Sequence, residues 1–495
     1  MNGMVPGKEN ISPVAINQQL YAVQRHLVLQ NNVQYCILIL SSCLSRDARL
    51  LLRVVMKVAV LGAGIVGSAT AYMLARDGHE VTIIDRCDRP GMETSFANGG
   101  LMTPSDSSPW NSPGTIKRLG KMLFDTNSTL KINSSAIPSI VGWGLKFLSN
   151  STHKRHKANM VSNIRIASLS LETLRSIRQN STLHYDQTTR GTMRVFPRGG
   201  RMSEFVQMCR EMQGWGVKFD VLDQEQILEK EPCLKDVIDR YIGAVYFPDD
   251  ESGDAHKFTN EMARLAKELG AQFLMRANIL EIVKQSSSRI SHVKTSVGEI
   301  HADAYVLSLG SYSPIFARPL GIQLPIVPVK GYSVTLPLNG WKGGPTRPVM
   351  DDGYHAMMVP MGDRLRMGGK AEFAQYNTKI DPNEGRRVLD DILRILPSMA
   401  AHVDVSSALT WSGLRPMTPD GPPIVGPTPY ENLFLNTGHG PLGWTMSCGS
   451  AKITAELVTH GRVLSNSVDP RDYMLRQVRR SDRSAVALAQ NGLVS

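Results

Sequence analysis

The chain has 495 residues, more than one ordinary domain holds, so two domains or one large domain with insertions are expected. Its 42% hydrophobic and 20% charged residues are typical of a soluble globular protein and exclude a disordered or fibrous one. The net charge of +11 includes no long basic run interleaved with aromatic residues, so we expect no nucleic-acid partner.

Residues 1–55 differ in composition from the rest of the chain. They are rich in Asn, Gln and Ser, and their one long apolar run, at 35–44, is too short to span a membrane and too far from the start for a signal peptide. We expect either a disordered extension or a misplaced start codon upstream of Met56. The six cysteines show no CxxC spacing, so we expect no metal site, no disulfide framework and a reducing, cytoplasmic location.

The patterned part of the chain begins at Met56. Residues 57–62 and 80–85 are short apolar strands that flank a helix at 68–78. Further along, helices are expected at 255–270 and 447–461 and buried strands at 271–275, 303–310 and 432–438. Alternating segments at 191–196, 330–337, 354–360 and 364–369 are typical of antiparallel strands. The pattern predicts an α/β fold in which an antiparallel β-rich domain is inserted into a Rossmann-like domain.

Three glycines lie directly between the first strand and the first helix. Gly62, Gly64 and Gly67 have G-x-G-x-x-G spacing, which allows a tight turn, close approach of a pyrophosphate and close helix packing. Asp85 ends the second strand, where a carboxylate binds an adenosine ribose. The motif predicts a dinucleotide site and disfavours NADP, but it does not separate FAD from NAD.

Four further segments carry a family resemblance. They are TSFANGG (94–100), KGYSVTLP (330–337), WSGLRPMTPDGPPIVG (411–426) and NLFLNTGHGPLGWTMSCGS (432–450). From Met56 to about residue 480 the chain closely resembles the FAD-binding subunit of bacterial D-amino acid dehydrogenases, within the D-amino acid oxidase and glycine oxidase group. The resemblance implies FAD, oxidative deamination of an amino acid to a 2-oxo acid and ammonia, and transfer of electrons to the respiratory chain.

The resemblance also implies domain limits and cofactor contacts. The FAD-binding domain is expected at 56–140, 250–316 and 411–495, and the substrate domain at 141–249 and 317–410. Two positions depart from the family: Pro441, which lacks an N–H, replaces a threonine, and Leu101 replaces a glutamine. Cys448 does not match the local sequence of relatives with covalent flavin, so we expect non-covalent FAD. The expected cofactor-binding residues are Val58, Ala59, Val60, Leu61, Gly62, Ala63, Gly64, Ile65, Val66, Gly67, Asp85, Arg86, Ser95, Asn98, Gly99, Gly438, Gly440, Leu442, Gly443, Trp444 and Thr445.

An arginine binds a carboxylate best because its guanidinium donates two parallel hydrogen bonds. Arg415 is our candidate for the substrate carboxylate, with Arg366 and Arg364 as rivals and a structural ion pair as the alternative. Tyr332 either places a hydroxyl above the substrate or packs in the core; Tyr354 is a weaker candidate.

His439 lies between two glycines at the expected flavin site. Hydride transfer needs a neutral amine and no side-chain base at Cα, so positioning or flavin contact is favoured over general-base catalysis.

A dehydrogenase of this kind needs an acceptor other than oxygen. We expect a quinone or electron carrier, with a partner subunit as a further candidate. Basic patches lie at 117–121, 153–157 and 471–483, and segments 115–124 and 139–157 mix basic with apolar residues. They predict either peripheral contact with the inner face of the cytoplasmic membrane or an ordinary solvated surface. The alternatives for function are an oxygen-using glycine, sarcosine or imino acid oxidase and, from another class, a flavin-binding protein without chemistry.

Overall fold

A computed structural model describes residues 55–114 and 130–475. Apart from Val55, the expected extension at 1–55 lies outside these residues. The same holds for the segment at 115–124, the basic patch at 117–121 and the end of the patch at 471–483.

The first sheet has, among the described residues, six strands in the order β19-β20-β13-β1-β2-β9. All neighbours are parallel except β19 and β20, and β1 pairs with β2 on one side and β13 on the other. Its short apolar strands are buried on both faces, as is usual for parallel sheets. The strands are β1 (Lys57–Leu61), β2 (Glu80–Ile84), β9 (Gln272–Leu274), β13 (Ala304–Leu307), β19 (Ile424–Pro427) and β20 (Leu433–Thr437).

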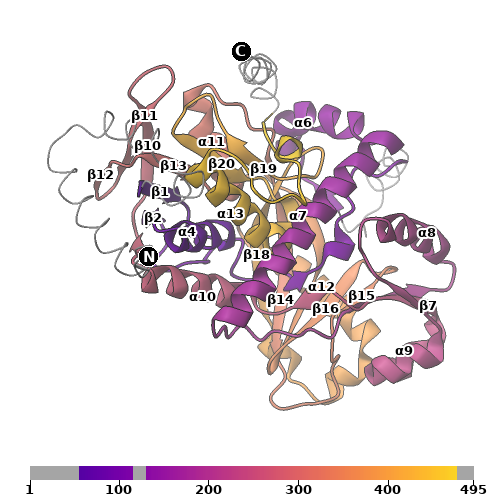
Figure 1. Cartoon of the computed structure of the whole chain (residues 1–495). Helices are drawn as coiled ribbons and strands as arrows, with labels where there is room; N and C mark the ends of the chain where they lie inside the picture. The colour runs from indigo at the N-terminus through magenta and orange to yellow at the C-terminus, as the bar shows by residue number, and fades with distance from the viewer. Residues whose placement is uncertain (1–54, 115–129, 476–495) are drawn as a thin grey trace, which may run out of the picture. The chain divides into compact units, whose positions relative to one another are not determined.

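Different elements cover the two faces of this sheet. On one face α4 (Ile65–Arg76) packs against both α10 (Ala255–Glu268) and α13 (Gly443–His460), as Figure 1 shows. α7 (His153–Asn180) packs against α13 from outside. On the other face lie α11 (Ser313–Ala317) and a small antiparallel sheet of β10 (Ile279–Lys284), β11 (Ile290–Thr295) and β12 (Gly298–Ile300).

The second sheet is largely antiparallel and, in the described chain, has nine strands. Their order is β18-β14-β17-β16-β15-β5-β7-β6, and β4 lies beside β17. α12 (Pro382–Ile395) packs on β14, β16 and β17 through an apolar face that includes Val388 and Ile392. The strands are β4 (Leu130–Ile132), β5 (Thr192–Pro197), β6 (Asp220–Leu222), β7 (Tyr241–Phe247), β14 (Val327–Pro337), β15 (Val349–Asp351), β16 (Ala356–Met361), β17 (Arg364–Phe373) and β18 (Leu409–Met417).

Smaller elements complete the described chain. β3 (Leu101–Met102) and β8 (Glu251–Ser252) form a two-stranded sheet. The remaining α-helices are α6 (Ile137–Ser149), α8 (Met202–Gln213) and α9 (Gln224–Lys230). No helix among the described residues combines the length and apolar character required to cross a bilayer.

The predicted fold class, a Rossmann-like domain with an antiparallel β-rich part, is confirmed. Every strand and helix expected from the sequence is present, and α4 and α13 begin three and four residues earlier than predicted. The limits proposed for the two domains stay a prediction. β18 runs in the β-rich sheet, although its sequence was grouped with the FAD-binding part.

Candidate active site

The turn after β1 closes around glycines. Gly62 has a φ of +104°, and a Cβ there would lie 2.7 Å from the carbonyl oxygen of Ser308. A Cβ at Gly67 would lie 1.8 Å from the carbonyl oxygen of Gly62. Gly62 must therefore be glycine because its backbone is left-handed. Gly67 must be glycine because α4 packs directly against the turn at Gly62. Gly64 and Ile65, at the N-terminus of α4, line a large cavity.

Asp85, at the end of β2, lies beside this turn. Its Oδ2 accepts a hydrogen bond of 2.7 Å from the N–H of Ala63, and its Oδ1 accepts one of 2.8 Å from the N–H of Cys87. The neighbouring Arg86 donates from Nε to Glu93 at 2.7 Å. Asp85 and Arg86 both line the cavity, so the structure brings the predicted ribose-binding acid to the glycine-rich turn.

The predicted cofactor residues of β1 itself lie behind the turn. Val58, Ala59, Val60 and Leu61 are at most 1% exposed and pack into the core on both faces of the sheet. They and Ala63 are not part of the cavity wall. Their side chains hold the strand in place instead of facing a ligand.

The loop after β2 forms the next part of the wall. Ser95 Oγ accepts a hydrogen bond of 3.0 Å from the N–H of Ile65 and so caps the start of α4. Asn98 Oδ1 accepts one of 2.9 Å from the N–H of Gly100. Ser95, Asn98 and Gly99 all line the cavity, as predicted cofactor residues should.

The GHGPLGWT segment leads into α13 at the opposite wall. Leu442 is the N-cap of α13 and makes no side-chain capping bond, and the first residues of the helix line the cavity. Thr445 Oγ1 donates to the carbonyl of Leu101 at 3.2 Å, which ties this segment to β3. Gly438 lies outside the wall and packs on Thr418. The wall residues of this segment are His439, Gly440, Pro441, Leu442, Gly443, Trp444 and Thr445.

His439 is 2% exposed, and its Nε2 lies 2.9 Å from Ser450 Oγ on α13. Burial lowers the pKa of His439 to about 3, so its imidazole is neutral at physiological pH and a weak base. The hydrogen bond of the His439 ring thus links the GHGPLGWT segment to α13. The positioning role of His439 stays a prediction.

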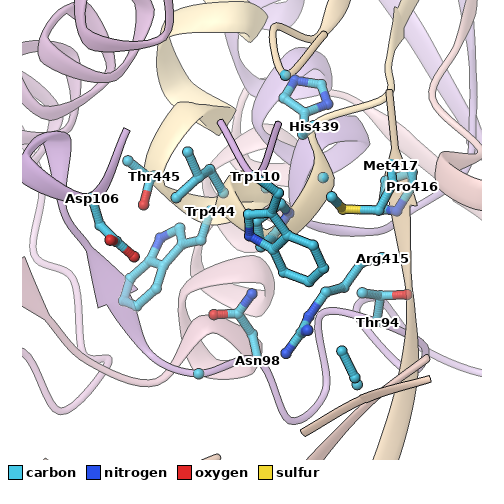
Figure 2. Close-up of a pocket in the computed structure, with 18 of the residues that line it drawn as sticks. Thr94, Asn98, Asp106, Trp110, Arg415, Pro416, Met417, His439, Trp444 and Thr445 are labelled. Carbon is cyan, nitrogen blue, oxygen red and sulfur yellow. The ribbon is translucent and has the colours of Figure 1, made fainter. Parts of the chain in front are cut away.

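Arg415 reaches the cavity from β18. Its side chain is half-buried, and its Cζ lies 5.8 Å from the ring centroid of Trp110; Figure 2 shows both side chains in the cavity. On its other side the guanidinium rests on β14, where a Cβ at Gly331 would lie 2.7 Å from Cζ. Among the described residues no carboxylate pairs with Arg415. Burial lowers its pKa to about 10, so it remains a cation at neutral pH.

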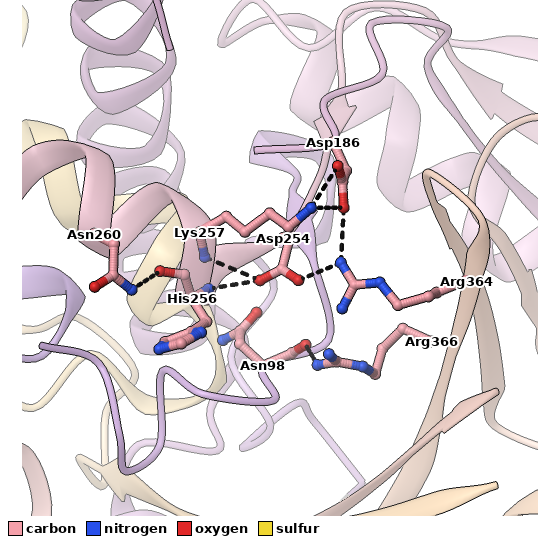
Figure 3. A network of polar contacts seen from close by, with 8 residues as sticks. All are labelled: Asn98, Asp186, Asp254, His256, Lys257, Asn260, Arg364 and Arg366. Carbon is pink, nitrogen blue, oxygen red and sulfur yellow. Dashed lines mark hydrogen bonds and ion pairs between the residues drawn. The ribbon is translucent and has the colours of Figure 1, made fainter. Parts of the chain in front are cut away.

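The two alternative candidates for the substrate carboxylate, Arg364 and Arg366, form contacts with other protein groups. Arg364 Nη2 bonds Asp186 at 2.7 Å and Asp254 at 2.8 Å, and Figure 3 shows this network. Arg366 donates from Nη1 to the carbonyl of Asn98 at 2.8 Å. Neither arginine lines the cavity. Burial lowers the pKa of Arg366 to about 10, and its Nε has no partner in the described chain.

Tyr332 presents its ring to the face of the second sheet that α12 covers. Its hydroxyl donates to Glu372 Oε2 at 3.0 Å, and Lys330 Nζ lies 3.3 Å from the same oxygen. The ring belongs to the core cluster that contains Val388 of α12. Tyr332 contributes to the cavity wall, but its hydroxyl is held by Glu372, as in the core-packing alternative. Tyr354 lies outside the wall.

The cavity measures about 1350 Å³, larger than the space that a drug-sized ligand needs, so it can hold a dinucleotide and a small substrate. Several of its buried polar atoms have no hydrogen-bond partner in the described chain, which is rare unless a polar ligand supplies one. These atoms are Thr103 Oγ1, Ser308 Oγ, Asn436 Oδ1 and Trp444 Nε1. The donors, the acceptors and the glycine-rich turn fit FAD.

Sequence reasoning missed Trp110 and Gly331, which enclose the Arg415 guanidinium. The glycine of the KGYS segment was a signal, because a glycine inside a strand often marks a close approach by another group. Trp110 lies in a loop with no periodic pattern, and nothing in the sequence distinguished it.

A dinucleotide-binding turn, the starts of α4 and α13 and an arginine without a carboxylate partner in the described chain line one cavity. Together they define an oxidoreductase of the dinucleotide-binding α/β class. The chain belongs to the FAD-dependent oxidoreductase family, whose model matches residues 57–457. FAD as cofactor and the predicted family resemblance are therefore confirmed.

Two curated relatives are D-amino acid dehydrogenases. The protein from Bradyrhizobium diazoefficiens is 42% identical over 404 residues, which cover 82% of this chain and 95% of the relative. The protein from Rhizorhabdus wittichii is 41% identical over 403 residues, which cover 81% and 96%.

Solved structures share the fold. L-proline dehydrogenase from P. horikoshii has a TM-score of 0.66 at 20% identity and covers 86% of this chain and 100% of its own. Glycine oxidase from Geobacillus kaustophilus has a TM-score of 0.64 at 21% identity, with coverage of 85% and 98%.

Proposed function

We propose that this protein is an FAD-dependent dehydrogenase that converts D-amino acids to 2-oxo acids and ammonia. The observation that carries the proposal is Arg415, a half-buried cation without a carboxylate partner in the described chain, on the same cavity as the dinucleotide turn. A substrate carboxylate supplies the missing partner. The D-amino acid dehydrogenases that align over four-fifths of the chain support the substrate class.

The residues of the cavity orient the substrate. Arg415 binds the carboxylate with two hydrogen bonds, and its guanidinium lies over Gly331 on one side and 5.8 Å from the Trp110 ring on the other. Bound FAD would supply the acceptor for the hydride that leaves Cα, and water would hydrolyse the resulting imino acid to a 2-oxo acid and ammonia. His439 stays neutral and holds the loop before α13, so it takes no proton from Cα.

The test is reduction of the bound flavin without oxygen. Purified protein is mixed under nitrogen with D- and L-amino acids, glycine, sarcosine and hydroxyproline, and the flavin absorbance is followed. We expect bleaching by D-amino acids and little hydrogen peroxide in air. Stoichiometric peroxide would identify an oxygen-using oxidase instead, and a flavin that no substrate reduces would identify a binding protein without chemistry.

We further propose that the electrons go to a quinone or another carrier at an anionic membrane surface on the cytoplasmic side. α6 exposes Ile137, Val141 and Leu145 at i, i+4 and i+8, with exposures of 49%, 53% and 65%. This set, the outer face of α6, is a continuous apolar stripe. Lys146 adjoins it on the helix, and residues 153–157 add Lys154, Arg155 and Lys157 at the start of α7.

The inner face of α6 is anchored near the cavity. Trp143 Nε1 donates to the carbonyl of Met417 at 3.0 Å, and its ring stacks on Phe147 with centroids 5.0 Å apart. Phe147 and Met417 also line the cavity. A membrane that receives the outer face of α6 would thus lie close to the cavity wall, where a quinone or a partner subunit could accept electrons.

A further inference from the structure

The hairpin of β11 and β12 carries two histidines and a glutamate on one face. In its antiparallel register Val293 lies opposite Ile300 and Lys294 opposite Glu299, so His292 and His301 are the next opposed pair. Side chains two apart in a strand share a face, which places Glu299 beside His301 and diagonal to His292. The cavity lining includes none of these three residues.

The potential ligand atoms of these side chains converge. His292 Nε2 lies 3.4 Å from Glu299 Oε1, and His301 Nε2 lies 3.5 Å from Glu299 Oε2. One ligand atom from each of the three lies within 4.8 Å of the others, and the two imidazole centroids are 5.0 Å apart. Two atoms bound to one tetrahedral Zn²⁺ at about 2.0–2.1 Å lie about 3.3–3.4 Å apart, close to both nitrogen–oxygen distances.

His292 also has the arrangement of a ligand held ready by a second contact. Its Nδ1 lies 3.1 Å from Ser291 Oγ, and its Nε2 is buried without a hydrogen-bond partner in the described chain. A hydrogen bond from Nδ1–H to the serine leaves the lone pair of Nε2 directed at the cluster. The side chains of Glu299 and His301 are 53% and 65% exposed, so an ion has access from solvent.

We propose that His292, Glu299 and His301 form a binding site for Zn²⁺ or a similar divalent transition metal. Two imidazoles and one carboxylate leave one tetrahedral position for water, and they suit zinc better than magnesium or calcium. The ion joins β11 to β12 just before the chain enters β13, the partner of β1. This site departs from the expectation of no metal, which rested on cysteine spacing and overlooked the Glu-x-His pair at 299–301.

The test is zinc titration of the FAD-loaded full chain after treatment with a chelator, followed by calorimetry. One ion per chain should bind, and it should raise the melting temperature because it binds only the folded state. Glu299→Gln and His301→Ala, both at exposed positions, should each weaken binding by roughly tenfold or more and abolish the thermal shift.

Two controls separate the site from other effects. His402→Ala removes an exposed histidine that stacks on Trp341, and it should leave zinc binding unchanged. Lys294→Met alters the same hairpin without removing a ligand, and it should bind zinc at least as tightly because a cation opposite Glu299 is lost. Absence of saturable zinc binding, or binding that survives in both ligand variants, would overturn the proposal.

Discussion

At the scale of single residues, Arg415 is a half-buried cation whose guanidinium has no carboxylate partner in the described chain. Arg415→Met removes the charge and Arg415→Lys keeps it without the two-pronged geometry. In Arg415→Met we expect kcat/KM for a D-amino acid to fall by a factor equivalent to roughly 2–4 kcal/mol of transition-state stabilisation. The loss in Arg415→Lys should be smaller, and FAD should stay bound in both variants. Steady-state kinetics with an artificial acceptor measures this. Unchanged kinetics in Arg415→Met would contradict the assignment of Arg415 to the substrate carboxylate.

Gly331 makes room for that guanidinium. In Gly331→Ala the new Cβ would lie 2.7 Å from Cζ and 2.8 Å from Nη2 of Arg415, so the guanidinium must shift. We expect a loss of about tenfold to hundredfold in kcat/KM with the flavin spectrum unchanged.

A double-mutant cycle tests whether the loss is transmitted through Arg415. The same Gly331→Ala change should have little effect in an Arg415→Met background. Gly214→Ala, whose Cβ makes only an ordinary contact of 3.5 Å, serves as the control. Equal losses in both backgrounds would show that Gly331 acts on the sheet and not on the arginine.

At the scale of elements, α6 is anchored by Trp143 and Phe147, while its outer face is exposed among the described residues. We expect the protein to sediment with vesicles that contain anionic lipid and to be released by salt, because each basic residue near the surface contributes about 1 kcal/mol. Replacing Lys154, Arg155 and Lys157 with Gln, or Val141 and Leu145 with Gln, should weaken sedimentation. Leu280→Gln is a matched control, since Leu280 is 63% exposed but lies on β10. Vesicle binding that does not depend on salt or on lipid charge would contradict the predicted role of the basic residues.

The elements themselves were largely predictable, because short apolar runs and glycine-flanked helices encode β1, β2, β13, β20, α4 and α13 locally. Which face of a strand lies toward the cavity could not be predicted from the sequence. β14 is covered on both faces, so Lys330 and Tyr332 are as buried as their neighbours on the cavity face, and alternation carries no contrast. Only the pairing of β14 with β17 and β18 shows that Gly331 faces Arg415 while Tyr332 faces Glu372.

At the scale of the whole molecule, one buried carboxylate links distant segments and makes stability depend on pH. Asp250 is 3% exposed, and its Oδ2 accepts hydrogen bonds from Ser105 Oγ at 2.5 Å and Thr192 Oγ1 at 2.7 Å. Desolvation raises the pKa of Asp250 to about 7. The folded state therefore holds this proton more tightly than the unfolded state does, and its contribution to stability is lost as pH rises from about 4 to 7.

Asp250→Asn should remove this dependence. We expect the variant to match the parent near pH 4 and to be more stable at pH 8, by about 2–4 kcal/mol in unfolding free energy. Thermal melts across that range measure it. The exposed Asp236→Asn should follow the parent at both pH values, and a constant offset for Asp250→Asn would contradict the assignment.

The attachment of the flavin is also a property of the assembled protein. Cys448 lies on α13 and is fully buried in the hydrophobic core, and it is not part of the cavity wall. Burial raises the pKa of its thiol to about 12. A thiol of this kind is a poor nucleophile, so FAD should be held without a covalent bond. Acid precipitation should leave the yellow colour in the supernatant. Flavin in the pellet would restore Cys448, or another residue, as an attachment point.

The order of the first sheet has a consequence for synthesis on the ribosome. β1 emerges early, yet the Lys57 N–H bonds Asp303, which lies 246 positions later, and α4 packs on α13 at 443–460. The nascent chain must therefore keep the apolar strands β1 and β2 from aggregating until most of it has been made. The glycine-rich turn is translated long before the segment at 439–445 with which it shares the cavity wall. The full FAD-binding surface therefore forms only after the segment at 439–445 has been made, 377 or more positions beyond Gly62 (439 − 62).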